Sequence, residues 1–247
     1  MKQLYSQPIW AIPDNVVYAL PLSAESLVLS LSSLTGGYII DKKGWKPTFL
    51  VGLFILFFGQ LMSAFARDAL LFIIARSVSG MGMGLTFISM QNFVVLPSTE
   101  EERNDGISAL NSGGFAGLNA GLIIGGTLAE KIGFSNVFYF SAGLVIICIL
   151  FSARMFKNAI RQQQDEEVIE SHKNLLNFFL DSKILSFFLL LFLPVIICTM
   201  FLDYFFPLFA EGESMSPAAI SRSFLLNGLT IIYLGPVLSK HIIKRMG

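Results

Sequence analysis

The 247-residue chain is 54% hydrophobic and only 14% charged, and its 17 basic and 17 acidic residues give a formal net charge of zero. A soluble domain carries about a quarter charged residues, so the apolar excess indicates a chain that lies in a lipid bilayer. The balanced charge predicts no nucleic-acid partner.

A membrane-spanning α-helix needs about 20 mostly apolar residues. Seven segments satisfy this requirement, so the sequence predicts an all-α, polytopic membrane helix bundle. These segments are residues 20–40, 47–66, 69–96, 107–129, 136–156, 184–209 and 218–239. Serines and Glu25 make the first segment the least apolar, and we expect Glu25 to begin this helix on the outer side.

The basic residues predict the orientation, because cytoplasmic loops of membrane proteins are enriched in lysine and arginine. If residues 41–46 are cytoplasmic, twelve basic residues fall on that side and four on the other, with Arg76 inside a span. The N-terminus is then outside the cell, although no apolar span precedes it. We therefore expect a plasma (inner) membrane protein with at least one further helix upstream of Met1 and more sequence beyond Gly247.

The spans fall into two groups separated by a charged segment that contains RQQQDEEVIESHK. Residues 1–156 are predicted to form an N-terminal helical bundle without its first helix. Residues 157–183 are predicted to be a cytoplasmic linker, and residues 184–247 the truncated start of a C-terminal bundle.

The stretch GGYIIDKKGWKP, residues 36–47, places an aspartate, three lysines and a glycine turn between the first two spans. Gly37 would allow close approach of a neighbouring helix. Asp41 could cap the next helix, and Gly44 permits a tight reversal. An ordinary helix–helix loop with cytoplasmic positive charge has the same features, so the residues alone leave that alternative open.

The spacing within this stretch resembles the signature loop of the major facilitator superfamily, G-x-x-x-D-[RK]-x-G-[RK]-[RK], which lies between its second and third helices. Trp45 departs from the pattern, because a basic residue is usual there. In that family the aspartate and basic residues form a charge network that latches two helix bundles on the cytoplasmic side. The resemblance implies a gating loop, with Asp41 as the latch residue. The matching residues are Gly37, Asp41, Lys42, Gly44 and Lys46.

The third span contains RSVSGMGMG, which begins at Arg76. An arginine inside a bilayer costs about 2.5 kcal/mol or more, so it usually faces a cavity or a partner. Alternatively, Arg76 extends to the nearby outer surface. The segment is similar to the superfamily's fourth-helix motif, R-x-x-x-G-x-G, whose arginine is implicated in proton coupling or substrate binding. We expect Gly80 and Gly84 to pack against a neighbouring helix.

The fourth span has glycines at every fourth position, which places them on one helix face. Such a face allows another helix to approach closely, so packing is the favoured interpretation. The segment resembles the fifth-helix motif of the family's antiporters, G-x-x-x-G-P-x-x-G-G, but Leu122 replaces the proline that marks drug–proton antiporters. The glycines are Gly113, Gly117, Gly121 and Gly125.

Polar residues within the spans are candidates for ion coupling or substrate binding. Asp203, in FLDYFFPLF, either binds a proton or cation or is an interfacial aspartate near the outer end. The other candidates could instead be interhelical hydrogen-bond partners. They are Gln91, Asn111, Asn119 and Asn227.

A weaker copy of the signature pattern, GPVLSKHIIKRMG, begins at Gly235. Its separation from Gly37 suits a repeat of six helices, which is the size of each half of a facilitator. Counted from the signature loop, the seven spans resemble helices two to eight of the family's twelve.

The sequence contains no nucleophile–base set, phosphate-binding loop, metal-ligand spacing or cofactor motif, so neither an enzyme nor an ATP-driven pump is predicted. The resemblance implies a secondary active transporter that moves a small solute by alternating access, with proton coupling as a further hypothesis. Two alternatives stay open: a membrane sensor or receptor that keeps a facilitator-like bundle without transporting, and an inactive fragment.

Overall fold

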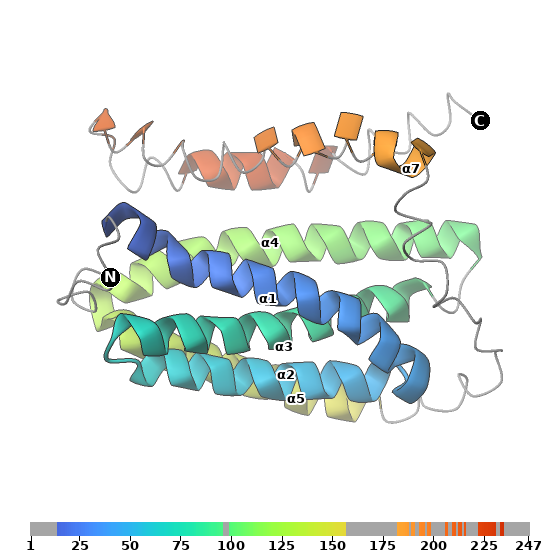
Figure 1. The fold of residues 1–247 in the computed structure, drawn as a ribbon, viewed down its shortest axis with the longest axis horizontal. Coiled ribbons are helices and arrows are strands. Elements are labelled where there is room, and N and C mark those ends of the chain that lie inside the picture. The colour runs from blue at the N-terminus through green and yellow to red at the C-terminus, as the bar shows by residue number, and fades with distance from the viewer. Residues whose placement is uncertain are drawn as a thin grey trace. The chain divides into compact units, whose positions relative to one another are not determined.

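The computed structural model describes residues 14–95, 99–156 and parts of 182–234 (Figure 1). The chain forms two compact units, Met1–Asp165 and Glu166–Gly247. The second unit contains α7 (Ser182–Phe187) and a helical stretch at residues 222–230. No described residue is in a β-strand, and the predicted all-α class is confirmed. The first unit contains α1 (Asp14–Lys43), α2 (Trp45–Phe65), α3 (Ala69–Val95), α4 (Glu100–Ile132) and α5 (Phe134–Met155).

Four of the described helices are long and apolar enough to cross a membrane, which confirms the prediction of a multi-pass membrane protein. α1 has 30 residues, but its serines make it less apolar and it is not among the four. The predicted spans at 184–209 and 218–239 lie partly outside the described residues. The four helices cover Trp45–Phe65, Ala69–Val95, Glu102–Ile132 and Phe134–Met155.

Single glycines join α1 to α2 and α4 to α5. Gly44 and Gly133 both have φ of 82°, a backbone conformation that side chains strongly disfavour. α1 continues past Asp41, and the amide of Gly44 donates to the carbonyl of Ile40 at 2.7 Å. The six-residue loop expected at 41–46 is therefore wrong in extent, because one glycine reverses the chain.

Polar side chains begin the two helices that follow longer connections. Before α3, the carboxylate of Asp68 accepts a hydrogen bond from the amide of Leu71 at 2.8 Å. Before α4, Thr99 and Glu102 form a reciprocal capping box. This box starts α4 well before residue 107, where the apolar pattern placed the beginning of the span.

α3 lies between α1 and α2 in the first unit and packs closely against both (Figure 1). Toward α1, a Cβ atom added at Gly80 would lie 2.3 Å from the carbonyl oxygen of Glu25. One added at Gly84 would lie 2.4 Å from the carbonyl oxygen of Leu29. Because no side chain fits at these positions, the two glycines set the separation of the helices.

A second face of α3 packs against α2, which runs in the opposite direction. A Cβ atom added at Gly82 would lie 2.4 Å from the amide nitrogen of Leu56. One added at Gly59 of α2 would lie 2.5 Å from the hydroxyl of Ser79, which is fully buried. Glycines on both faces therefore allow α3 to contact two neighbouring backbones at once.

Two expectations about glycine packing are not met within the described residues. The close approach expected at Gly37 occurs one residue earlier, at Gly36, where an added Cβ atom would lie 2.8 Å from Cγ2 of Ile88. An added Cβ atom would meet no atom within 4 Å along the glycine face of α4, so no other described helix of the first unit packs on that face. These open positions are Gly37, Gly113, Gly117, Gly121 and Gly125.

We predict that Gly82→Ala lowers the free energy of unfolding by about 1–3 kcal/mol, because the new methyl group overlaps the α2 backbone. Gly117→Ala is the matched control. It introduces no overlap and gains up to about 1 kcal/mol of helix propensity. Denaturant titration in mixed detergent micelles measures both variants, and equal losses of stability would contradict the close packing of α2 and α3.

Candidate functional site

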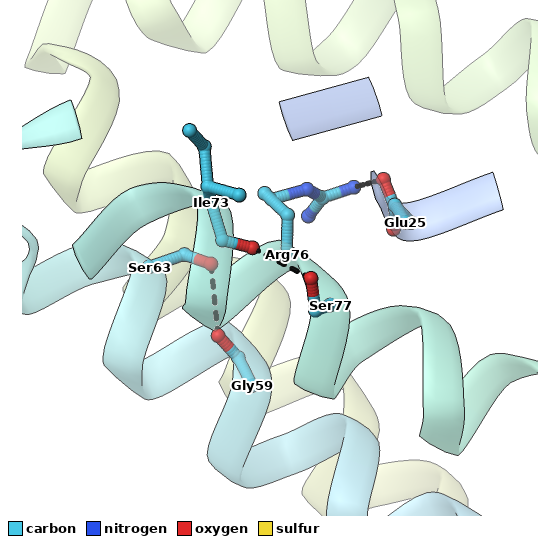
Figure 2. A network of polar contacts seen from close by, with 6 residues as sticks. All are labelled: Glu25, Gly59, Ser63, Ile73, Arg76 and Ser77. Carbon is cyan, nitrogen blue, oxygen red and sulfur yellow. Dashed lines mark hydrogen bonds and ion pairs between the residues drawn. The ribbon is translucent and has the colours of Figure 1, made fainter. Parts of the chain in front are cut away.

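The close approach of α1 to α3 brings a carboxylate and a guanidinium together within the bundle. Nη2 of Arg76, on α3, donates to Oε2 of Glu25, on α1, and the two side chains form an ion pair (Figure 2). The side chain of Glu25 is 9% exposed and that of Arg76 is 21% exposed. Gly80 lies one helical turn beyond Arg76 and contacts the backbone of Glu25, so the glycine contact positions the pair.

The guanidinium of Arg76 also faces α5. Its central carbon lies 5.9 Å from the ring centroid of Phe138, within the range of a cation–π interaction. The ring of Phe72, one turn before Arg76, packs edge-on against Phe138 with centroids 5.8 Å apart. Residues of α1, α3 and α5 therefore converge on one cation.

The position of Glu25 corrects the expectation drawn from the sequence. Glu25 does not begin its helix, because α1 starts at Asp14 and Glu25 lies well inside it. The sequence motif around Arg76 does not indicate this partner. The usable signal was a pair of opposite charges within apolar spans, because each charge alone is costly in lipid.

Two serine hydroxyls shown in the same view as the ion pair (Figure 2) bond within their own helices. The hydroxyl of Ser77 donates to the carbonyl of Ile73 at 2.9 Å, and that of Ser63 donates to the carbonyl of Gly59 at 2.8 Å (Figure 2). These hydroxyls have backbone partners of their own. The pair therefore holds the charge of this region, and a change in either member alters the electrostatic contact between α1 and α3.

The signature turn forms a second polar region. Asp41 is exposed in the last turn of α1, and Lys42 beside it is also exposed. Nζ of Lys42 donates to the hydroxyl of Tyr38 and lies 4.2 Å from the centre of its ring. Lys46, in contrast, is half-buried and donates to the backbone carbonyl of Phe156 at the end of α5. Asp41 and Lys42 therefore face outward, whereas Lys46 is bound to the end of another helix.

The remaining polar candidates are dispersed. Gln91 is half-buried on α3, and Asn111 is exposed on α4. Nδ2 of Asn119 donates to the carbonyl of Phe115 in its own helix at 2.8 Å. Asn227 is exposed in the second unit, and Asp203 lies outside the described residues. Within the described ranges, no hydrogen bond joins any of these side chains to the ion pair.

We predict that Glu25→Gln and Arg76→Gln each lower the free energy of unfolding by about 3 kcal/mol, because each leaves a buried or half-buried charge inside the bundle without its partner. The double variant removes both charges and should be more stable than either single variant. Denaturant titration in detergent measures all three, with Lys131→Gln, at an exposed position of α4, as a control. Single variants as stable as the control would show that the pair does not hold α1 to α3.

Comparison with known proteins places the chain among membrane transporters. The multidrug resistance protein MdtG of Serratia proteamaculans (strain 568) is 25% identical over 160 residues, which cover 64% of this chain and 38% of that protein. An uncharacterized transporter of Buchnera aphidicola is 28% identical over 159 residues, covering 62% and 39%. The synaptic vesicular amine transporter of Bos taurus is 26% identical over 135 residues, covering 54% and 26%. The matches span about two fifths of the length of the two bacterial relatives.

The sequence pattern of one family covers nearly the whole chain, matching residues 13–247. This range includes the signature turn, the helix with Arg76 and the second unit. The resemblance expected from the signature residues is therefore confirmed. The chain belongs to the Major Facilitator Superfamily of membrane transporters.

Proposed function

We propose that the protein is a secondary active transporter of the plasma membrane that moves a small solute by alternating access and couples this movement to protons. The family supports membrane transport, and the bacterial relatives support the plasma membrane. The observation that carries the coupling proposal is the ion pair of Glu25 and Arg76 between α1 and α3.

Glu25 supplies a carboxylate that exchanges its bond to Arg76 for a proton or for a cationic solute. Protonation of the carboxylate removes the attraction that the ion pair contributes between α1 and α3, and leaves the guanidinium without its counter-charge. The lost attraction and the unpaired guanidinium both cost free energy, unless the helices rearrange or a bound solute compensates. The pair therefore supplies the physical link between the binding of a proton and a change in helix packing.

Asp41 and Lys42 serve as the gate in this proposal, as the signature pattern implies. Both side chains are exposed at the end of α1, where they are accessible to groups outside the first unit. Orientation by the positive-inside rule puts this end in the cytoplasm. Alternating access then requires these contacts to form in one state and break in the other.

The dispersed polar residues remain proposals for the solute pathway, and the open glycine face of α4 remains one for helix packing. Asp203 and Asn227 would contribute from the C-terminal half, and Gln91 from α3. Asn119 is the weaker of the two α4 candidates, because its amide already donates within its own helix.

Transport by the purified protein, expressed from its complete reading frame, tests the proposal. The protein is reconstituted into liposomes with an acidic interior. Radiolabelled tyramine, tetraphenylphosphonium, a sugar and an amino acid are added outside as probes. The amine and the lipophilic cation are included because two relatives are named for amine transport and multidrug resistance. We expect one probe to accumulate inside, and accumulation to stop when a protonophore removes the gradient.

The double variant Glu25→Gln with Arg76→Gln tests the role of the ion pair in coupling. It leaves no unpaired charge that would destabilise the fold. We expect its rate of accumulation to fall by about tenfold or more, equivalent to about 1.4 kcal/mol in the transport barrier. Lys131→Gln should transport at the original rate. Absence of accumulation with either polarity of the gradient would contradict transport, and equal accumulation by the double variant would contradict the role of the pair.

A further inference from the structure

The two sides of Gly44 have opposite environments. Asp41 and Lys42, before the glycine, are exposed. Trp45, immediately after it, is only 5% exposed, although the family pattern has a basic residue at this position. Thr48, one turn further along α2, is also buried, and its hydroxyl donates to the carbonyl of Gly44 at 2.9 Å. The beginning of α2 is therefore fixed within the bundle, whereas the end of α1 faces outward.

Trp45 is held by aromatic rings from two other helices. Its ring centroid lies 4.5 Å from that of Phe93, near the end of α3. It lies 5.0 Å from that of Phe156, directly after α5, in an edge-to-face arrangement. Phe93 and Phe156 also contact each other, with centroids 5.3 Å apart. These distances fall in the range where aromatic pairs stabilise one another beyond simple burial.

Lys46 makes a second connection to the same residue. Its Nζ donates to the backbone carbonyl oxygen of Phe156, which is the C-cap residue of α5. The carbonyl groups at a helix C-terminus lack partners within the helix and carry partial negative charge, so an ammonium group is favourable there. Phe156 thus receives a ring contact from Trp45 and a charged hydrogen bond from Lys46.

Phe156 also joins this contact to the core of the first unit. Its ring lies 6.2 Å from that of Phe49, and it packs against the buried cluster of Phe49, Leu53 and Val145. The start of α2 and the end of α5 are therefore parts of one packed assembly. Movement of the signature turn alone would have to separate several rings at once.

We propose that Trp45 and Lys46 are positioning residues that clamp the signature turn to Phe156, so that Asp41 and Lys42 move only together with α2 and α5. This inference rests on the proposed function, because it assigns the gating contacts of the motif to the exposed residues before Gly44. Lys46 then acts as the cap of α5 rather than as a member of the gate. The clamp makes the signature turn a rigid part of the first unit.

Hydrogen–deuterium exchange of the protein in lipid nanodiscs tests the clamp without reference to transport. Lys46→Met keeps the apolar stem and removes the ammonium, and Trp45→Arg restores the residue type usual in the family. We expect about tenfold faster amide exchange at residues 152–156 in both variants, because each loses contacts that oppose local opening. Trp45→Phe should keep exchange near the original, and Phe151→Ala, at a position 63% exposed on α5, is the matched control.

Unchanged exchange at residues 152–156 in Lys46→Met would overturn the clamp. If Trp45→Arg does not fold, Lys46→Met alone decides the question. If no probe is transported, the proposed function is contradicted. The exchange result still supports or overturns the clamp independently.

If a probe is transported, the maximal rate and KM of the variants distinguish a positioning role of Trp45 and Lys46 from a purely stabilising one. We expect the clamp variants to lower the maximal rate several-fold at unchanged KM, because the ion pair is left intact, with recovery in Trp45→Phe. Asp41→Asn should lower the rate with normal exchange at residues 152–156. Equal rates in the original protein and both clamp variants would overturn the positioning role.

Discussion

The backbone contact between α3 and α1 at Gly80 is the constraint on which the polar interior depends. An added Cβ atom there would lie 2.3 Å from a carbonyl oxygen of α1, so any residue other than glycine would push the helices apart. The same contact brings Glu25 within reach of Arg76. In lipid, close packing of small residues supplies the association that the hydrophobic effect supplies in water. The geometry of the charges is thus a consequence of the glycines.

The first unit carries two polar features with different physical roles. The ion pair lies between helices and changes their attraction when its charge changes. The signature turn lies at the helix ends, where Gly44 reverses the chain and Trp45 is buried among aromatic rings. We propose that the first feature responds to protons and that the second transmits rigid movement. Both features involve residues of α1, α3 and α5, so they belong to the same packed helices of the first unit.

Much of the helical framework could be predicted from apolar run length, because a bilayer requires about 20 apolar residues per span. Helix ends were less predictable, since the positive φ of Gly44 and the capping box at Thr99 shorten the connections. The partner of Arg76 required knowledge of which helices touch, and a one-dimensional sequence does not contain this. The inward orientation of Trp45 and Lys46 depends on Phe156, 110 residues beyond Lys46. The spacing of the motif therefore identified the turn, but it did not show that Asp41 and Lys42 are exposed while Trp45 is buried.

Disulfide trapping in native membranes measures the approach of α1 to α3 most directly. Gly36→Cys and Ile88→Cys lie on this interface, where a Cβ atom at position 36 is 2.8 Å from a side-chain carbon of Ile88. Cys148 and Cys198 are replaced by serine, and a protease site is inserted at residues 67–68. After mild oxidation and cleavage, the account predicts that the fragments stay joined on a non-reducing gel, whereas Leu34→Cys with Ile88→Cys, which uses an exposed α1 position, releases them. Fragments that separate in both pairs would contradict the account.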